Sequence, residues 1–309
     1  MLAYALRRLL VAVPTLFIIV TIAFFMIRIA PGGPFDRERA IPPEIEKNIL
    51  AAYDLDLPLW QQYLKYVGGV LQGDFGPSYK YRDFTVLDLI ASGLPASLQL
   101  GGIAIVLAVL FGITAGTFAA LSQNSRYDYL IMAGAMTGIA IPNFVMAPLL
   151  TLVFGVYLSL LPVAGWGDGA LANKILPVIA LALPQIAYIA RLTRGSMIET
   201  LSQNYVRTAR AKGLRERIVI VRHALRGALL PVVSYLGPAT AQIITGSVVI
   251  ETIFDFPGIG RHFVQGALNR DYTVVMGVMI FYATLIILFN LLVDLAYALL
   301  DPKVKYEQR

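Results

Sequence analysis

The sequence predicts an all-α membrane protein with six transmembrane helices. Of its 309 residues, 58% are hydrophobic and only 14% are charged, whereas soluble proteins carry about 25% charged residues. The mean hydropathy is +0.70. Six apolar segments follow one another along the chain, and most reach the roughly 17–25 residues that a helix needs to cross a bilayer core. Contact with lipid therefore explains the missing surface charge.

The first apolar segment, Leu9–Ile27, follows Arg7 and Arg8 and contains no charged residue. It is longer than the roughly 7–15-residue apolar core of a signal peptide, and no small-residue cleavage site follows it. We therefore expect a retained helix. Residues 1–28 form the predicted N-terminal tail and first span.

Residues 29–95 are polar and form the second predicted part of the chain. Pro42-Pro43, followed by Glu44 and Glu46, predicts the start of a helix, because proline and acidic side chains suit the first turn. A second helix is predicted from apolar side chains at helical spacing, namely Trp60, Tyr63, Leu64, Val67 and Leu71. Gly73-Asp74-Phe75-Gly76-Pro77 predicts a turn. This segment is either a long structured loop or a docking surface, and its aromatic residues also suit the membrane interface.

Five further apolar segments lie in the last predicted part of the chain, residues 96–309. They are Leu98–Leu121, Tyr129–Leu161, Ile175–Ala190, Leu229–Ile250 and Val274–Leu300. Tyr129–Leu161 is too long for one straight span and contains Pro142 and Pro148, so it is kinked, tilted or closed by an interfacial turn. Gly112 and Gly116 lie four residues apart in one span, which predicts a close contact with another helix.

Lysine and arginine are distributed unequally between the two sides of the predicted membrane. Six spans place both termini on one side, and the segments on that side hold fourteen Lys or Arg and five acids. The segments on the other side hold ten Lys or Arg and thirteen acids. The positive-inside rule therefore predicts cytoplasmic termini. The net charge of +6 reflects this sidedness, so we expect no nucleic-acid partner.

The sequence excludes several kinds of chemistry. It contains no cysteine and only two histidines, so disulfides, thiolate catalysis and cysteine-ligated metals are excluded. No Gly-Lys dipeptide occurs, so the phosphate-binding loop that ends in Gly-Lys is missing and the chain should not hydrolyse ATP. No catalytic motif is evident. We therefore predict no catalytic residue and no metal site.

Ionisable residues inside spans are candidates for function. Asp294 in the last span is either a proton or cation site or a structural partner of another helix. Arg191 and Arg194 close the fourth span and are expected to reach the membrane interface. Glu251 and the following turn are either a gate or a simple helix end.

Three polar residues of the fifth span, Leu229–Ile250, and the basic loop of residues 194–228 carry the functional hypothesis. Gln242, Thr245 and Ser247 line a path for solute, or else bond helix to helix.

The loop of residues 194–228 is strongly basic, with eight Lys or Arg against two acids. Tyr205–Lys212 predicts one short helix ending near Gly213, and Arg215–Arg226 predicts another. The first is expected to expose small side chains that the cleft of a partner protein can approach, namely Thr208, Ala209 and Ala211. The alternative is an amphipathic segment lying on anionic lipid, where each Lys or Arg contributes about 1 kcal/mol. Lipid contact explains the charge but not the small residues.

Ala209-x3-Gly213, with Leu230-Pro231 downstream, resembles the "EAA" loop of bacterial ABC importer permeases. Arg207 stands where that loop has its glutamate and Thr208 replaces the first alanine, and the spacing from Gly213 to Pro231 is longer. These departures look like the peptide-importer branch. Other matching motifs include Ala30-Pro31-Gly32, Gly73-Asp74-Phe75-Gly76, His223-Ala224-Leu225, Pro257-Gly258-Ile259-Gly260 and Arg270-Asp271-Tyr272. The similarity covers nearly the whole chain and looks closest to the B-type permeases of oligopeptide importers.

This resemblance implies a type I ABC importer permease fold with a structured periplasmic segment after the first helix. The implied ATPase-coupling loop comprises Arg207, Thr208, Ala209, Arg210, Ala211, Lys212, Gly213 and Leu214, and the implied binding-protein contact comprises Gly73, Asp74, Phe75 and Gly76. The implied partners are a homologous C-type permease subunit in a heterodimer, two ATP-binding subunits, a periplasmic peptide-binding protein and the lipid bilayer. ATP and Mg would be bound by the partner subunits, and no cofactor by this chain.

The implied activity is alternating-access import of oligopeptides across the inner membrane. Dipeptide, glutathione or metal-chelate cargo stays an alternative within the same mechanism. A secondary transporter that works without ATPases and a membrane-anchored scaffold belong to other classes. Neither explains the Ala–Gly pattern of the basic loop.

Overall fold

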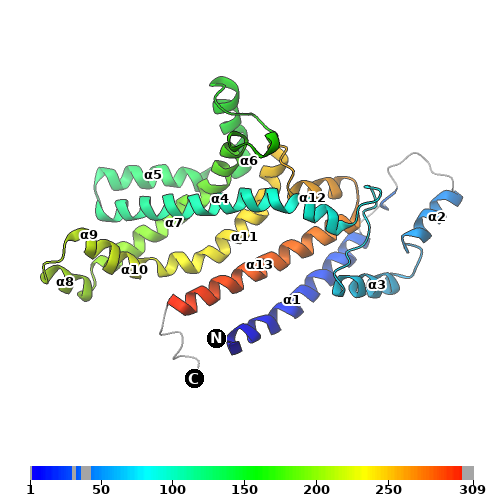
Figure 1. The fold of residues 1–309 in the computed structure, drawn as a ribbon, viewed down its shortest axis with the longest axis horizontal. Helices are drawn as coiled ribbons and strands as arrows, with labels where there is room; N and C mark the ends of the chain where they lie inside the picture. The colour runs from blue at the N-terminus through cyan, green and yellow to red at the C-terminus, as the bar shows by residue number, and fades with distance from the viewer. Residues whose placement is uncertain (1, 30–32, 36–42, 301–309) are drawn as a thin grey trace. The chain divides into compact units, whose positions relative to one another are not determined.

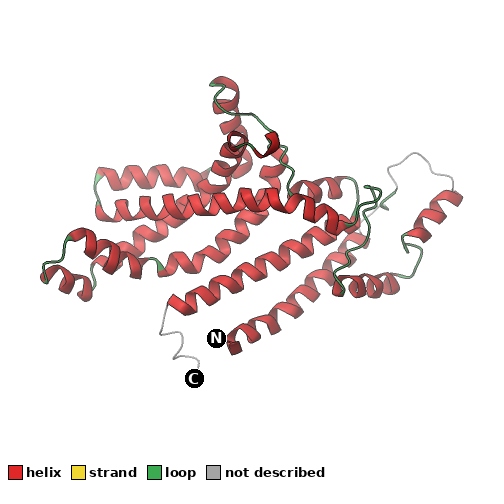
Figure 2. Cartoon of the chain, viewed as in Figure 1, coloured by secondary structure: helices red, strands yellow, loops and turns green. Residues whose placement is uncertain are grey.

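The computed structural model describes residues 2–29, 33–35 and 43–300, and these residues form helices and loops without a strand (Figure 2). Pro42 and the motif Ala30-Pro31-Gly32 lie outside the described residues. The chain divides into two compact units. The N-terminal unit comprises Leu6–Ala96 and Pro257–Thr284, and the core unit comprises Met1–Ala5, Ser97–Phe256 and Leu285–Arg309. Each unit is described by itself.

The N-terminal unit is built from α1, α2, α3 and α12 and from the first turns of α4 and α13 (Figure 1). Their bounds are α1 Leu2–Ile29, α2 Pro43–Ala52, α3 Leu59–Leu71, α4 Val86–Leu121, α12 Ile259–Leu268 and α13 Tyr272–Leu300. Helix α3 packs on α1, since the hydroxyls of Thr21 and Tyr63 lie 2.7 Å apart and the ring of Tyr63 meets that of Phe24 edge to face. The two helices predicted in residues 29–95 are confirmed.

Buried Asp271 fixes the loop between α3 and α4. Its carboxylate accepts hydrogen bonds from the hydroxyls of Ser78 and Thr273, the latter at 2.9 Å. Thr273 also donates to the carbonyl of Pro77 at 2.7 Å. A buried carboxylate is tolerated where it is hydrogen-bonded in this way, so the loop is tied to the start of α13.

Helix α7, Leu171–Leu201, is the centre of the core unit. It packs against α5, α6, α10 and α11. Of its most apolar stretch, 56% is buried, whereas a third or less is buried in the other candidate spans. The remaining elements of this unit are α5 Arg126–Ala140, α6 Asn143–Leu150, the π-helix η1 Thr151–Tyr157, the 3-10 turn η2 Gly167–Gly169, α8 Asn204–Ala211, α9 Glu216–Ile218, the π-helix η3 Val219–Ala224, α10 Leu225–Ala228 and α11 Leu230–Ile253.

Glycines let the backbones of neighbouring helices approach α7 closely. A Cβ atom on Gly112 would lie 2.7 Å from the side chain of Ile189, and one on Gly116 would lie 2.4 Å from the carbonyl oxygen of Ala190. The predicted close contact through these glycines of α4 is therefore confirmed. Gly138 of α5 behaves in the same way, since its Cβ would lie 2.6 Å from the carbonyl oxygen of Leu183.

The long apolar segment Tyr129–Leu161 is broken at Pro142. Helix α5 and the helical stretch Asn143–Tyr157 meet at an angle of 106°, because Ile141, the residue before the proline, is extended with φ −100° and ψ 117°. Of the kinked, tilted and interfacial alternatives, the kink is thus observed. The described residues contain five helices long and apolar enough to cross a membrane, or six if this bent pair is one span.

Helix α4 begins twelve residues before the apolar segment from which it was predicted, at Val86 instead of Leu98. A capping box explains the early start. The backbone N–H of Thr85 donates to Asp88 Oδ2 at 3.0 Å, and the backbone N–H of Asp88 donates to Thr85 Oγ1 at 3.2 Å. The predicted boundary between residues 95 and 96 therefore falls inside a helix.

The glycine contact between α4 and α7 can be tested with two alanine substitutions in α4. We expect Gly116→Ala to lower the free energy of unfolding by about 1–3 kcal/mol, because its new methyl group meets a backbone carbonyl. Gly102 is the matched control, since a Cβ there meets nothing within 4 Å. Gly102→Ala should be neutral or stabilising by up to about 1 kcal/mol through helix propensity. Thermal unfolding of the detergent-purified chain measures both, and equal effects would contradict the packing argument.

Candidate functional site

The basic loop is built around a helix end that requires glycine. Gly213 follows α8 with φ +76°, a conformation that side chains other than glycine rarely adopt. Its N–H donates to the carbonyl of Arg210 at 2.9 Å, and the N–H of Leu214 donates to the carbonyl of Ala209 at 3.4 Å. These two bonds form a Schellman motif. A Cβ at Gly213 would meet nothing within 4 Å, so the space around it is open.

One face of α8 is buried inside this chain. Val206 and Ala209 are 0% and 5% exposed, and they pack in one cluster with Ala120, Met197, Val219, Ala224 and Ala228. The expectation that Ala209 is exposed to a partner is therefore wrong, because its small size serves packing within the chain. Thr208 and Ala211 are exposed as expected, as are Arg207 and Lys212.

The two predicted short helices of this loop are present, the second as α9, η3 and α10 in succession. An ion pair joins them, since Arg210 Nη2 donates to Glu216 Oε1 at 2.6 Å and Arg210 Nε lies 3.2 Å from both carboxylate oxygens. Hydrogen bonding to Arg210 lowers the pKa of Glu216, and the same bond raises the pKa of Arg210. The Arg210–Glu216 ion pair, called the clasp below, thus connects the two residues that flank the turn at Gly213.

Exposed apolar side chains accompany the cations of this loop. Leu214, Ile218 and Val221 are 38%, 41% and 58% exposed. Mixed apolar and arginine-rich surfaces are typical of protein–protein interfaces. The loop therefore exposes both cationic and apolar side chains, in addition to the open space at Gly213.

A polar cavity of about 230 Å³ lies among α5, α6, α7 and α11, at the bend beside Pro142. Tyr235 donates to Gln185 Oε1 at 2.8 Å, and Gln185 Nε2 donates to Gln242 Oε1 at 3.0 Å. The rings of Tyr188 and Tyr235 stack with centroids 4.2 Å apart. These hydrogen-bonded amides and the tyrosine hydroxyl form a polar lining of the cavity between otherwise apolar helices.

The three predicted path residues are placed differently. Gln242 lines the cavity. Thr245 is exposed and bonds back to the carbonyl of Ala241 at 3.0 Å, whereas Ser247 is buried and bonds to the carbonyl of Ile244 at 2.7 Å. Only Gln242 of the three thus touches the cavity.

Arg194 forms an ion pair with a carboxylate of α5. Its Nε and Nη2 atoms each lie 2.6 Å from an oxygen of Asp128, which is 1% exposed. A carboxylate 66 positions earlier in the chain therefore holds Arg194, and its place at the membrane interface stays a prediction. Arg191, by contrast, is exposed and stacks over the ring of Tyr188 at 4.8 Å. The side chain of Asp294 lies outside the described residues.

The predicted turn at residues 73–77 is confirmed in the N-terminal unit. Gly73 and Gly76 have φ +79° and +85°, and the N–H of Gly76 donates to Asp74 Oδ1 at 2.8 Å. Phe75 is half-buried, while Gly73 and Asp74 are exposed. The turn thus presents backbone and a carboxylate at the surface.

Comparison with known proteins connects these features. Residues 112–306 match the family "Binding-protein-dependent transport system inner membrane component", and residues 1–101 match the family "Binding-prot-dependent transport system membrane comp, N-term". The chain belongs to this family of transport components. The resemblance to importer permeases is confirmed, and so is the prediction that the chain is not an enzyme.

Several members of this family are similar to the chain over nearly its full length. The chain is 58% identical to an "Oligopeptide transport system permease protein OppB" of Salmonella typhimurium and 54% identical to one of Haemophilus influenzae, each over 99% of this chain and 100% of the relative. A "Dipeptide transport system permease protein DppB" of Bacillus subtilis is 45% identical over 99% of both chains. A structure described as "Crystal structure of an amino acid ABC transporter with histidines" has a TM-score of 0.52 at 19% identity, covering 68% of this chain and 92% of that one. The fold is therefore shared with an ABC transporter.

Sequence reasoning missed the residues that surround Gln242. Gln185 and Tyr235 lie in predicted spans and are the partners that hold its amide in place. A lone amide directly after Pro184 in an apolar segment was the available signal. Asp128 was missed because nothing in its local sequence indicates a partner on α7.

The buried Asp128–Arg194 pair provides a stability test. We expect Asp128→Asn to lower the free energy of unfolding by roughly 2–3 kcal/mol, because Arg194, 28% exposed, loses the carboxylate that neutralises it. The double variant Asp128→Asn/Arg194→Met should recover part of this loss. Chemical unfolding of the purified chain measures the cycle. Strictly additive effects would show that the pair does not couple the two helices.

The Arg210–Glu216 clasp predicts a pH dependence of the loop. The folded-state pKa of Glu216 lies below its ordinary value of 4.5, so the clasp contributes stability above that pH and loses it as the pH falls through the lower folded value. We expect amide protection factors over residues 205–218 to fall below about pH 4.5 in hydrogen exchange corrected for intrinsic rates. Glu216→Gln should remove this step, and an unchanged step in that variant would overturn the assignment.

Proposed function

We propose that this chain is the transmembrane permease subunit of an ATP-driven ABC importer that translocates oligopeptides across the bacterial inner membrane. The observation that carries the proposal is full-length similarity to two oligopeptide permease proteins at 58% and 54% identity. The geometry agrees with it, because the chain combines apolar helices, a polar cavity among them and an exposed basic loop.

Six spans follow if the bent pair α5 and α6 crosses the membrane once. Both termini and the basic loop then lie in the cytoplasm, as the charge distribution requires. Residues 29–95 then lie in the periplasm. A candidate for binding-protein contact is the turn of Gly73, Asp74, Phe75 and Gly76, which exposes backbone groups and a carboxylate.

The energy is supplied by partner subunits, because this sequence lacks a phosphate-binding loop. Two ATP-binding subunits hold ATP and Mg, and one of them docks on the exposed surface beside Gly213. The buried face of α8 carries its movement into the chain, since Val206 and Ala209 are packed against Met197 of α7. A homologous C-type permease completes the pore as the other half of a heterodimer.

Transport proceeds by alternating access. Closing of the ATPase dimer moves α8 and α7, the cavity lined by Gln185, Tyr235 and Gln242 opens outward, and a peptide enters from the binding protein. Hydrolysis restores the inward state. Amide and hydroxyl groups suit this passage, because they hydrogen-bond any peptide backbone without selecting a side chain.

Dipeptides are the second candidate cargo, since a dipeptide permease protein is 45% identical to this chain. Competition of dipeptides and longer peptides for uptake by the complete transporter separates these two possibilities. Glutathione and metal chelates can be tried as competitors in the same assay.

The coupling role of the loop is tested by adding a side chain at Gly213. Asparagine tolerates left-handed backbone better than other residues, so Gly213→Asn should keep the turn while filling the open space. We expect peptide uptake and peptide-stimulated ATPase activity of the reconstituted transporter to fall at least about tenfold, as loss of a central interface contact commonly does. Membrane insertion and thermal stability of the chain should be unchanged.

Gly165 provides the matched control. It also has a left-handed backbone, with φ +92°, and its Cβ would also meet nothing within 4 Å, but it lies far from the basic loop in sequence. Gly165→Asn should leave uptake close to that of the unsubstituted chain. Normal uptake by Gly213→Asn would refute the assignment of this loop to ATPase coupling.

A further inference from the structure

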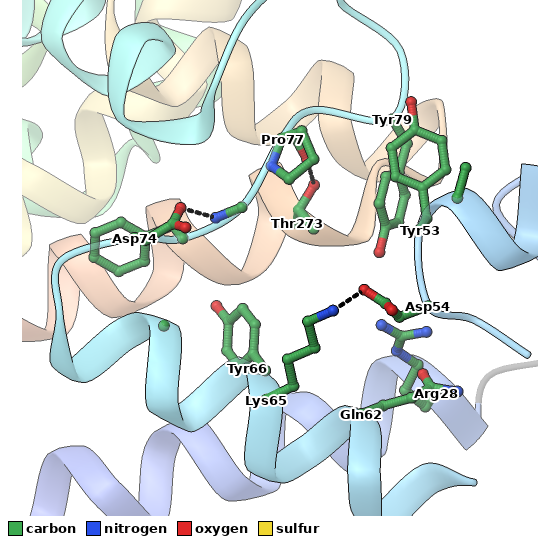
Figure 3. A pocket seen from close by; sticks show the side chains of 14 residues that line it. Arg28, Tyr53, Asp54, Gln62, Lys65, Tyr66, Asp74, Pro77, Tyr79 and Thr273 are labelled. Atoms are coloured by element: carbon green, nitrogen blue, oxygen red, sulfur yellow. Dashed lines mark hydrogen bonds and ion pairs between the residues drawn. The ribbon is translucent and has the colours of Figure 1, made fainter. Parts of the chain in front are cut away.

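The N-terminal unit contains a cavity of about 230 Å³ that the proposed transport path does not use (Figure 3). Its walls come from four separate stretches: the end of α1, the α2–α3 region, the loop before α4, and the start of α13. A single water needs only about 10–15 Å³, so the cavity has room for a small organic ligand. It is smaller than the roughly 300–1,000 Å³ pockets that hold drug-sized molecules.

Buried polar atoms without a partner gather around this cavity. In the part of the chain that the structure describes, seven side-chain atoms are buried without a hydrogen bond, and three of them belong to Arg28, Gln62 and Tyr66, which line this one space. Such atoms are rare in folded proteins, because each costs about 1–3 kcal/mol when left unsatisfied. Their concentration in one cavity points to a ligand that satisfies them together.

Arg28 has a guanidinium nitrogen without a hydrogen-bond partner. Its guanidinium lies over the rings of Phe24 and Tyr272, at 5.2 Å and 5.9 Å from their centroids, and it also hydrogen-bonds the hydroxyl of Tyr79. Its Nε has no hydrogen-bond partner, and no carboxylate of the described residues pairs with it. A guanidinium nitrogen without a partner can donate a charge-assisted hydrogen bond to a carboxylate.

The other lining groups define the rest of the ligand. Lys65 is already paired with Asp54, and Asp74 adds one further carboxylate to the wall. Two cations and two carboxylates therefore balance, which suits a zwitterion or monoanion better than a doubly charged phosphate. Gln62 is 8% exposed and spends its Nε2 on the carbonyls of Leu55 and Leu57, so its free Oε1 accepts from an N–H.

Tyr66 supplies a second donor beside Arg28. Burial raises the pKa of its hydroxyl, and the nearby Tyr79 raises it further. The group therefore stays protonated and able to donate. In Figure 3 the side chains of Tyr66, Lys65 and Arg28 project into the same space. Donors for a carboxylate and an acceptor for an N–H are the complement of one end of a peptide.

We propose that this cavity binds the α-carboxylate and adjacent N–H of a terminal peptide residue or of a free amino acid. Arg28 and Tyr66 donate to the carboxylate, and Gln62 Oε1 accepts from the N–H. The choice of peptide as ligand rests on the proposed transport function, whereas binding itself needs only this chain. The site would then hold the end of a peptide in the N-terminal unit, apart from the polar cavity of the core unit.

The test is equilibrium binding to the purified full-length chain in lipid nanodiscs, without partner subunits. The probes are trialanine, trialanine amide and free alanine. We expect trialanine to bind and its amide to bind at least about tenfold more weakly, since the amide lacks the charge that Arg28 recognises. Free alanine identifies the source of the carboxylate: binding as tight as that of trialanine assigns the site to amino acids, and weaker binding assigns it to peptides. Both of these outcomes support the proposal.

Two variants and one control locate the site. Arg28→Met should weaken trialanine binding about tenfold or more, and Tyr66→Phe several-fold, because each removes a donor to the carboxylate. Tyr66→Phe should leave thermal stability unchanged, since its hydroxyl has no partner in the free chain. Tyr63→Phe, on the same helix, loses a hydroxyl that bonds Thr21 and does not line the cavity, so its binding should be unchanged.

Equal binding of trialanine and its amide would overturn the proposal, as would full binding by Tyr66→Phe or no binding of any probe. Uptake of peptides by the complete transporter is measured separately. If the complete transporter imports peptides but the purified chain binds no carboxylate, only the assignment of the cavity is refuted. A complete transporter that does not selectively import peptides would instead refute the proposed function.

Discussion

Close packing against α7 is the constraint on which the core unit depends. Gly112 and Gly116 of α4 and Gly138 of α5 bring backbone against backbone, at distances where a single added methyl group would collide with a carbonyl or a side chain. In lipid the hydrophobic effect adds little between helices, so such close contact supplies much of the association. The short distances also leave little freedom for the helices to slide past one another.

The same helix links the two candidate sites of the core unit. Gln185 of α7 is bonded to Gln242 and Tyr235 at the cavity, and nine residues later Arg194 is clamped by Asp128 of α5. Near its end, Thr200 packs beneath Gly227 of the basic loop, where a Cβ would lie 3.4 Å from its methyl group. Cavity and loop are therefore connected through one continuous helix, and packed helices of this kind can carry coupling between distant sites.

The sequence predicted what depends on local pattern. Apolar length indicated the spans, and Gly213 marked the end of a helix, because left-handed backbone favours glycine wherever it occurs. It did not reveal which face of α8 is buried, since Ala209 and Ala211 are the same residue and only the tertiary packing buries the first and exposes the second. Asp128 and Arg194 are 66 positions apart, and the cavity around Arg28 is assembled from four distant stretches. Such pairings arise from the tertiary fold alone.

The burial of Ala209 changes how the loop can work. A small residue there packs in the cluster that joins α8 to Val219 and Met197, so the exposed part of the loop consists of Ala211, Gly213 and the surrounding cations. This arrangement gives α8 two faces with different tasks. A displacement of α8 would be transmitted to its neighbours, because Val206 and Ala209 of its inner face are buried against η3 and the end of α7. The packed face, more than the charge, makes the loop suited to carry movement toward the cavity.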